Sequence, residues 1–304
     1  MSTQINKAFE QSFSDNFIHL ASQKTSKLSG AVRVENINDA KAFHFDRMDT
    51  VSMVQAVSRH EDTPLTEVPF SRRRVTFNTY RAVDLIDNPD RVKMAKDPTS
   101  PTMKQLVAAM NRQKDDAIIA AALGNAYSIN SSDSASTVSL PSGQQIAHGS
   151  ADLTLAKLLT AKKTLLNNDV DPGEEPMYIV IGPDQLDALL NVTTNTSIDY
   201  NSVRALVNGE IDTWVGFKFI ISTRLAKSGN IRSCFAWAKS GIGLAMNGTP
   251  NIRISERSDK NYSTQCFVEC SLGATRIEDE KVVQIDCDES AYCLLYTSPS
   301  PRDS

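Results

Sequence analysis

The segment that most constrains the fold is a long helical stretch from Pro101 to Leu123. Ser100 is a good N-cap residue, Pro101 suits the first helical position, and Gly124 suits the residue after the end. One apolar face recurs at helical spacing and consists of Met103, Leu106, Val107, Met110, Ala117, Ile118 and Ala121. Because Ile119 lies opposite this face, we expect the second half of the helix to be buried on two sides.

The segments around this helix mix strands and helices. Residues 31–80 hold short strand-like runs, and the small polar residues 127–150 indicate a loop or a flexible hairpin. The sequence ADLTLAKLLTAKKTLLNNDVD predicts an amphipathic helix that ends at Asn167 or Asn168. MYIVIGP predicts a buried strand, Pro183 opens a further helix, and WVGFKFIIS, SCFAWAKSGIGLAM and the stretch that follows alternate like antiparallel strands. This order predicts an α+β fold in which distant segments close one composite domain.

Two N-terminal segments have too little apolar content to bury themselves. Residues 1–30 are polar apart from scattered positions such as Phe13 and Phe17, which indicates an arm with one short helix that needs a partner surface. Residues 31–80 read as a long extended hairpin with an exposed bend at HEDTPLTEVPFS, and we expect it to make few contacts within its own subunit. Segments of this kind are usually buried against another copy of the chain.

Composition excludes several classes of protein. The chain has 304 residues, 40% of them hydrophobic, so it can bury a substantial core. Its net charge of -4 is the reverse of the basic surplus of a dedicated duplex-binding domain. No apolar run is long enough to span a bilayer, and MSTQINKAFEQSF lacks an apolar signal core. We therefore expect a protein made and kept in a cytoplasm, without a membrane partner.

The sequence offers no constellation for catalysis, a cofactor or a metal. The histidines at positions 19, 44, 60 and 148 are scattered, and none lies in HExxH or beside a candidate nucleophile. GIGLAMNG lacks the ending of a phosphate loop. The four-residue spacing of Cys266 and Cys270 on a strand-rich stretch indicates packing on one face more often than metal binding. We expect a protein that is not an enzyme.

The last residues differ in sequence character from the rest of the chain. The run CLLYTSPSPRDS begins at Cys293 and resembles the read-through translation of a transposase-type sequencing adaptor. The alternative is an ordinary disordered tail rich in proline and serine. We therefore expect no functional role for residues 292–304.

Several strings, in order, carry a resemblance to a known family. SRRRV, DLID, DPTS and DDAIIAAALG follow one another as in major capsid proteins of tailed bacteriophages, and LTLAKLLTAKKTLLNNDVDP followed by YIVIGPDQLDALL is also similar. The resemblance covers most of residues 30–290, and no short motif is diagnostic alone. It implies the Hong Kong 97-like capsid fold. The implied divisions are an N-arm (1–30), an extended E-loop (31–80), a peripheral domain (81–150 and 247–291) with the long helix as its spine, and an axial domain (151–246).

The resemblance also implies a function and a set of partners. The chain would be a structural major capsid protein that assembles through hexamers and pentamers into the icosahedral head shell of a virion, in the cytoplasm of a bacterial host. The implied partners are other copies of the chain, a separate scaffolding protein, a portal protein and packaged DNA contacted non-specifically. Two alternatives stay open: an encapsulin-type compartment shell, and a nucleic-acid-binding protein that uses Arg72–Arg74.

The arginine run in FSRRRVTFNTY supplies the candidate contact residues. Strand alternation places Arg72 and Arg74 on one face and Arg73 on the other, which suits a segment held between neighbouring subunits better than a flat phosphate patch. We hypothesise that Arg72 and Arg74 pair with carboxylates of an adjacent subunit; a solvated edge strand is the alternative. Neighbouring carboxylates on a helix point about 100° apart, so Asp115 and Asp116 would not share one site, and we expect a solvated or interfacial helix edge there. The full set of candidates is Arg72, Arg73, Arg74, Asp115, Asp116, Glu278, Asp279 and Glu280.

Overall fold

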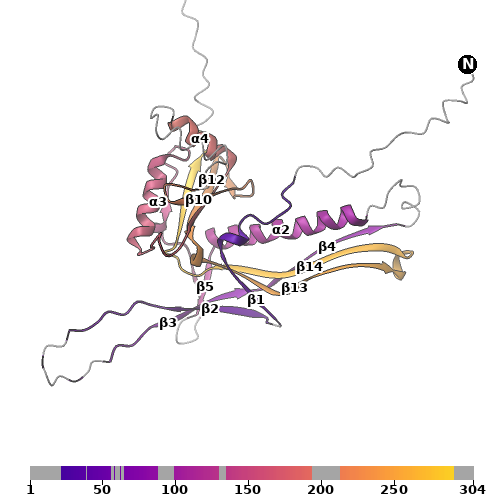
Figure 1. Ribbon diagram of the computed structural model, residues 1–304, viewed down its shortest axis with the longest axis horizontal. Coiled ribbons are helices and arrows are strands. Elements are labelled where there is room, and N and C mark those ends of the chain that lie inside the picture. The colour runs from indigo at the N-terminus through magenta and orange to yellow at the C-terminus, as the bar shows by residue number, and fades with distance from the viewer. Residues whose placement is uncertain are drawn as a thin grey trace, which may run out of the picture. The chain divides into compact units, whose positions relative to one another are not determined.

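Figure 1 shows a computed structural model of the chain. It describes residues 22–38, 40–55, 58, 62, 65–87, 99–129, 135–193 and 213–290. The helix expected within residues 1–21 and the tail at 292–304 lie outside the described residues. The chain divides into a first unit (Met1–Ser26, Thr79–Gln113 and Thr249–Cys270) and a second unit (Lys27–Asn78, Lys114–Gly248 and Ser271–Ser304).

The secondary structure is mixed, as expected. The helices are α2 (Thr99–Leu123), α3 (Leu155–Asn167) and α4 (Pro183–Thr193), with short 3-10 turns η2 (Ser29–Ala31), η3 (Ser142–Gln144), η4 (Lys239–Gly241) and η5 (Ser258–Lys260). The strands are β1 (Arg33–Ile37), β2 (Ala42–Met48), β3 (Phe70–Thr76), β4 (Asn78–Ile86), β5 (Ala126–Ile129), β6 (Ala135–Val138), β7 (Gln145–Ile146), β8 (Met177–Ile181), β9 (Thr213–Trp214), β10 (Phe217–Ile221), β11 (Lys227–Ser228), β12 (Ile231–Ala238), β13 (Ile242–Arg257), β14 (Ser263–Arg276) and β15 (Val282–Asp288). Among the described helices, none combines the length and the apolar character that crossing a bilayer requires.

A seven-stranded sheet holds the main core of the second unit. Its strands follow the order β7-β15-β12-β8-β10-β9, and β11 pairs with β12. Strand β8 lies between the antiparallel β12 and the parallel β10, so its run MYIVI is almost continuously buried, as the sequence predicted. Helices α3 and α4 contribute Leu158, Leu165 and Leu189 to the same core as Phe235 and Trp237.

Two smaller sheets complete the described fold. One has the strand order β1-β13-β14-β4, and the other has the order β2-β3-β5-β6. Phe45 and Val75 of the second of these sheets pack in a small core with Ala245. Neighbouring segments of the chain approach each other closely there. A Cβ at Gly243 would lie 2.5 Å from the Phe45 ring, and a Cβ at Gly273 would meet the carbonyl oxygen of Thr76, so both positions require glycine.

Several expectations for the helices and turns are confirmed. Helix α2 ends at Leu123, and Ile118 and Ile119 on its two sides are both buried. Helix α3 is capped at its start by Thr154 and ends at Asn167. The polar stretch after α2 contains the antiparallel pair β5–β6. On β14, Cys266 and Cys270 both lie on the buried face, as same-face packing predicted. The start of α2 differs, because the helix begins at Thr99 and includes Ser100.

The expectation of few internal contacts for residues 31–80 is wrong for most of the segment. Strand β1 pairs in parallel with β13, and β3 is an interior strand between β2 and β5. The reason is that β2 and β3 place their buried side chains, Phe45 and Val75, on one face of the sheet. The low apolar content of the segment as a whole does not show this alternation. The described residues between β2 and β3 do fit the expectation, since they are exposed and form no helix or strand. Met53 and Leu65 are 101% and 98% exposed.

Candidate inter-subunit contact residues

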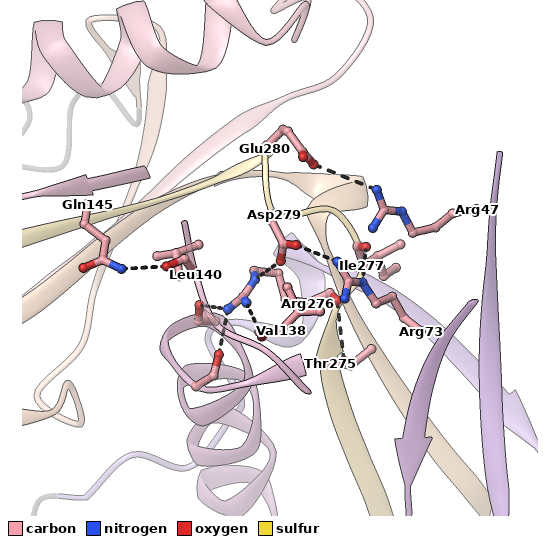
Figure 2. Close-up of polar contacts among 12 residues, drawn as sticks. Arg47, Arg73, Val138, Leu140, Gln145, Thr275, Arg276, Ile277, Asp279 and Glu280 are labelled. Atoms are coloured by element: carbon pink, nitrogen blue, oxygen red, sulfur yellow. Dashed lines mark hydrogen bonds and ion pairs between the residues drawn. The ribbon is translucent and has the colours of Figure 1, made fainter. Parts of the chain in front are cut away.

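Arg73 points into the second unit and is almost completely buried. Its side chain is 3% exposed, and Nη2 lies 2.5 Å from Oδ2 of Asp279. Its Nε also donates to the carbonyl oxygen of Ile277 at 3.3 Å. Figure 2 shows Arg73 and Arg276 converging on the Asp279 carboxylate. The structure therefore brings together two of the predicted contact residues, Arg73 and Asp279, within one chain.

Arg276 connects this carboxylate to the end of α2. The side chain is fully buried, and its Nε donates to Oδ1 of Asp279. Its Nη1 donates to the carbonyl oxygens of Ala122 at 3.2 Å and Gly124 at 2.7 Å, and Nη2 donates to that of Val138 at 3.1 Å. The last carbonyl groups of a helix lack partners within the helix and carry partial negative charge. Arg276 therefore satisfies and neutralises the C-terminal end of α2.

The buried cluster has more positive than negative charge. Burial lowers the pKa of Arg73, Asp279 opposes that effect, and Arg47 and Arg276 add to the lowering. Arginine nevertheless stays protonated in proteins. Removing the single carboxylate of Asp279 would leave two buried guanidinium groups without a counter-ion, which is far more costly than losing a surface pair.

Arg72 and Arg74 lie on the other face of β3, so the predicted division of the triplet is confirmed. Arg72 is opposite Asp46 of β2, and its Nε donates to Oδ1 of that residue at 2.8 Å. The two side chains are 63% and 69% exposed. Arg74 lies between His44 of β2 and Tyr127 of β5 in the register. The pairing of Arg72 and Arg74 with another subunit stays a prediction.

The two neighbouring aspartates of α2 have different partners. Asp115 is fully buried, and its carboxylate accepts hydrogen bonds from the backbone N–H groups of Lys27 at 3.0 Å and Leu28 at 3.2 Å. The expectation of a solvated or interfacial edge is therefore wrong for Asp115, because a packed segment from the N-terminal side covers it. Asp116 forms two hydrogen bonds with Arg224, and this pairing raises the pKa of Arg224.

The acidic residues that flank Asp279 make weaker contacts. The carboxylate of Glu278 lies 3.4 Å from the Lys281 ammonium group. An oxygen of Glu280 lies 4.0 Å from the Arg47 guanidinium group, and the Glu280 side chain is 55% exposed. Among the acidic candidates that form ion pairs with a basic side chain, Glu280 has the most exposed side chain.

Sequence reasoning missed the arginines that complete these contacts. Arg276 had a usable signal, since it is a lone cation in the small apolar run SLGATRI and precedes Asp279 by three residues. Arg224 and Arg47 had no comparable signal, because their partners come from distant segments. Within the described residues, no group of three or more His, Cys, Asp or Glu side chains is placed to hold a metal ion.

Comparison with known families identifies the class of protein. The family described as phage capsid protein matches residues 5–289, and the chain belongs to this family. A search of curated proteins found no match. The family match selects a phage capsid over the encapsulin-type shell and the nucleic-acid-binding protein.

Solved capsids share the fold. The chain is similar to the capsid of cyanophage P-SCSP1u, with a TM-score of 0.71, 16% identity and 94% of each chain covered. It is also similar to the capsid of Ralstonia phage GP4, with a TM-score of 0.70, 12% identity and coverage of 98% of this chain and 97% of the other. For the cyanophage Pam1 capsid the TM-score is 0.68, the identity 13% and the coverage 95% and 98%. The expected Hong Kong 97-like fold is confirmed, and the chain is a structural protein of a phage head shell.

Proposed function

We propose that copies of this chain assemble through hexamers and pentamers into a closed icosahedral head shell, without catalytic turnover. The observation that carries the proposal is the exposed stretch between β2 and β3 in a chain of the phage capsid family. Val51, Met53, Val54, Leu65 and Val68 are 41% to 101% exposed there. Soluble monomers rarely leave several large apolar side chains of one stretch in water, so this stretch is suited to contact a second copy.

The proposed domains follow the resemblance, with one refinement. We propose residues 1–30 as the N-arm, 31–80 as the E-loop, 81–150 and 247–291 as the peripheral domain, and 151–246 as the axial domain. The refinement concerns β7 and β15, which these ranges place in the peripheral domain. Both strands pair within the seven-stranded sheet, which supports moving them to the axial domain. Within the E-loop, we propose that the described residues between β2 and β3 and the exposed face of β3 reach a neighbour.

The proposed subunit contact places Arg72 and Arg74 against a carboxylate of an adjacent copy. Asp115 and Asp279 already accept two donors within their own chain and are buried. Glu280 is more exposed and only weakly held, which supports it as the partner. Each such exposed pair contributes about 0–1 kcal/mol, and a shell repeats it at every equivalent contact.

The remaining partners are proposed from the resemblance. They are a separate scaffolding protein, a portal protein and packaged DNA contacted without sequence specificity, with assembly in the cytoplasm of a bacterial host. The net charge of -4 supports DNA contacts through local basic groups rather than through the protein's overall field.

Assembly can be tested by expressing the chain with its neighbouring genes and examining particles by sedimentation and negative-stain microscopy. We expect closed shells from the unmodified chain and fewer shells from the double variant Arg72→Ala/Arg74→Ala. Lys163→Ala/Lys239→Ala, at two exposed positions outside β3, is a matched control for the loss of two positive charges. A chain that stays monomeric with its scaffold present would overturn the proposal. Normal shells from the double variant would show that Arg72 and Arg74 are not assembly contacts.

A further inference from the structure

An apolar groove lies along the first half of α2 in the first unit. Its volume is about 440 Å³. Its apolar lining, here called the floor, consists of Met103, Val107 and Ala108 of α2 and Ile252 of β13. Gln105 and the exposed Lys24 and Lys104 also line it. Ile252 is 49% exposed, and Met103 and Val107 remain half-buried. The groove thus offers apolar surface to a further segment, with positive charge at its edge.

The first described residues of the chain lie beside this groove. The carbonyl oxygen of Gln23 accepts a hydrogen bond from Nη1 of Arg112 at 3.0 Å. The carbonyl oxygen of Lys24 accepts one from Nδ2 of Asn111, also at 3.0 Å. These bonds hold two consecutive residues against α2, one turn beyond the groove floor, and Lys24 itself lines the groove. The described chain therefore begins beside the groove.

The sequence of that segment matches an amphipathic helix. Phe13, Phe17 and Leu20 follow the spacing i, i+4, i+7, which places them on one helical stripe. Glu10 flanks the stripe, opposite in sign to the lysines at the groove edge. A helix over residues 13–20 would be about 12 Å long, and Leu20 can lie at most about 14 Å from Lys24 along the chain.

We propose that residues 1–21 dock in the α2 groove of their own chain, with Phe13, Phe17 and Leu20 against its apolar floor. Recognition of an amphipathic helix by an apolar groove uses such i, i+4, i+7 anchors. The short connection to Lys24 gives the segment an effective concentration in the mM range, which favours it over a second copy in dilute solution. The segment would cover apolar surface of the unassembled chain, and the proposal does not depend on the shell geometry proposed above.

Cross-linking in the full-length, unassembled chain tests this arrangement. In a Cys293→Ser background, Phe17→Cys/Val107→Cys should give an intramolecular cross-link with a short bismaleimide, identified by mass spectrometry. Asp15→Cys/Val107→Cys is the matched control, because position 15 lies on the opposite side of the helix. We expect a yield on the order of tenfold higher for the position-17 pair, since a docked stripe excludes the opposite face. Equal yields overturn the proposal, and cross-linked dimers would assign the groove to a second copy instead.

Hydrogen exchange gives a second readout that needs no cysteine. The double variant Phe13→Ser/Phe17→Ser should accelerate amide exchange over residues 103–108 by on the order of tenfold, because local protection falls with the lost apolar contact. Gln11→Ser/Asp15→Ser, on the opposite face, should leave that exchange unchanged. Helix α3, in the second unit, serves as the internal reference in both variants. Unchanged exchange over residues 103–108 in the first variant contradicts docking even where its fold is intact.

Discussion

The two halves of α2 are built from similar residues but differ in how far the described residues bury them. In the first half, Met103 and Val107 remain half-buried beside a groove. In the second half, Ile118 and Ala122 are fully buried, and Arg276 binds the carbonyl groups at the helix end. One helix therefore combines a part that is buried by the described residues with a part that leaves apolar surface for a further segment.

The most severe way to break the completed half is to remove its buried carboxylate. Asp279→Ala leaves Arg73 and Arg276 buried without a counter-ion, and we expect a loss of about 3–5 kcal/mol in the free energy of unfolding. Urea denaturation measures the loss, and hydrogen exchange should locate it at the end of α2. Glu278→Gln, at the neighbouring and more exposed position, is the control and should change stability by less than about 0.5 kcal/mol. Equal losses for the two variants would show that the buried carboxylate of Asp279 stabilises the fold no more than an exposed one does.

The comparison between the halves is tested directly by two truncations in one helix. Ile118→Ala removes fully buried atoms and should cost about 2–4 kcal/mol. Val107→Ala, in a Phe13→Ser/Phe17→Ser background that removes the anchors of the docked segment, should cost less than about 1 kcal/mol, because the described residues only partly remove its side chain from water. Both substitutions are measured by urea denaturation in that same background. A Val107 variant as damaging as the Ile118 variant would mean that the described residues also bury the first half of α2.

Acid should weaken the second unit through Glu289. Burial alone would raise the pKa of Glu289, but hydrogen bonds from Arg232, Lys227 and Gln185 outweigh it and lower the pKa to about 2. The carboxylate therefore contributes stability above its unfolded pKa of about 4.5, and this contribution is lost as pH falls from there through 2. After allowance for solvent screening, we expect the unmodified chain to lose about 1–2 kcal/mol more than Glu289→Gln between pH 6 and pH 3. Parallel pH profiles of the two proteins would contradict this assignment.

The smallest effect on stability is expected at the exposed arginine of the triplet. Arg72→Ala removes an ion pair with Asp46 that is open to water, so the free energy of unfolding should change by less than about 1 kcal/mol. Arg73→Ala, one residue further along, removes a buried partner of Asp279 and should cost several-fold more. Thermal denaturation of the two variants under identical conditions makes the comparison. Equal destabilisation would show that the two faces of β3 are equally buried in solution.

Local patterns predicted much of this molecule. Helical spacing located α2 and α3, and a continuous apolar run located β8, because each signal lies within a few neighbouring residues. Strand alternation separated Arg73 from its neighbours correctly. It could not reveal that Arg73 meets Asp279, since 206 residues separate them along the chain. The burial of Asp115 was missed for the same reason, because backbone groups of a distant segment cover it.

The distance in sequence between Arg73 and Asp279 has a consequence for biosynthesis. Ribosomes add about 5–20 residues per second, so roughly 10–40 seconds pass between the synthesis of these two residues. During that interval, the end of α2 and the inner face of β3 lack the residues that join them. A nascent chain cannot complete this junction until Asp279 has emerged from the ribosome. The late synthesis of one carboxylate thus delays closure of the contact between β3 and the end of α2, although both elements are made much earlier.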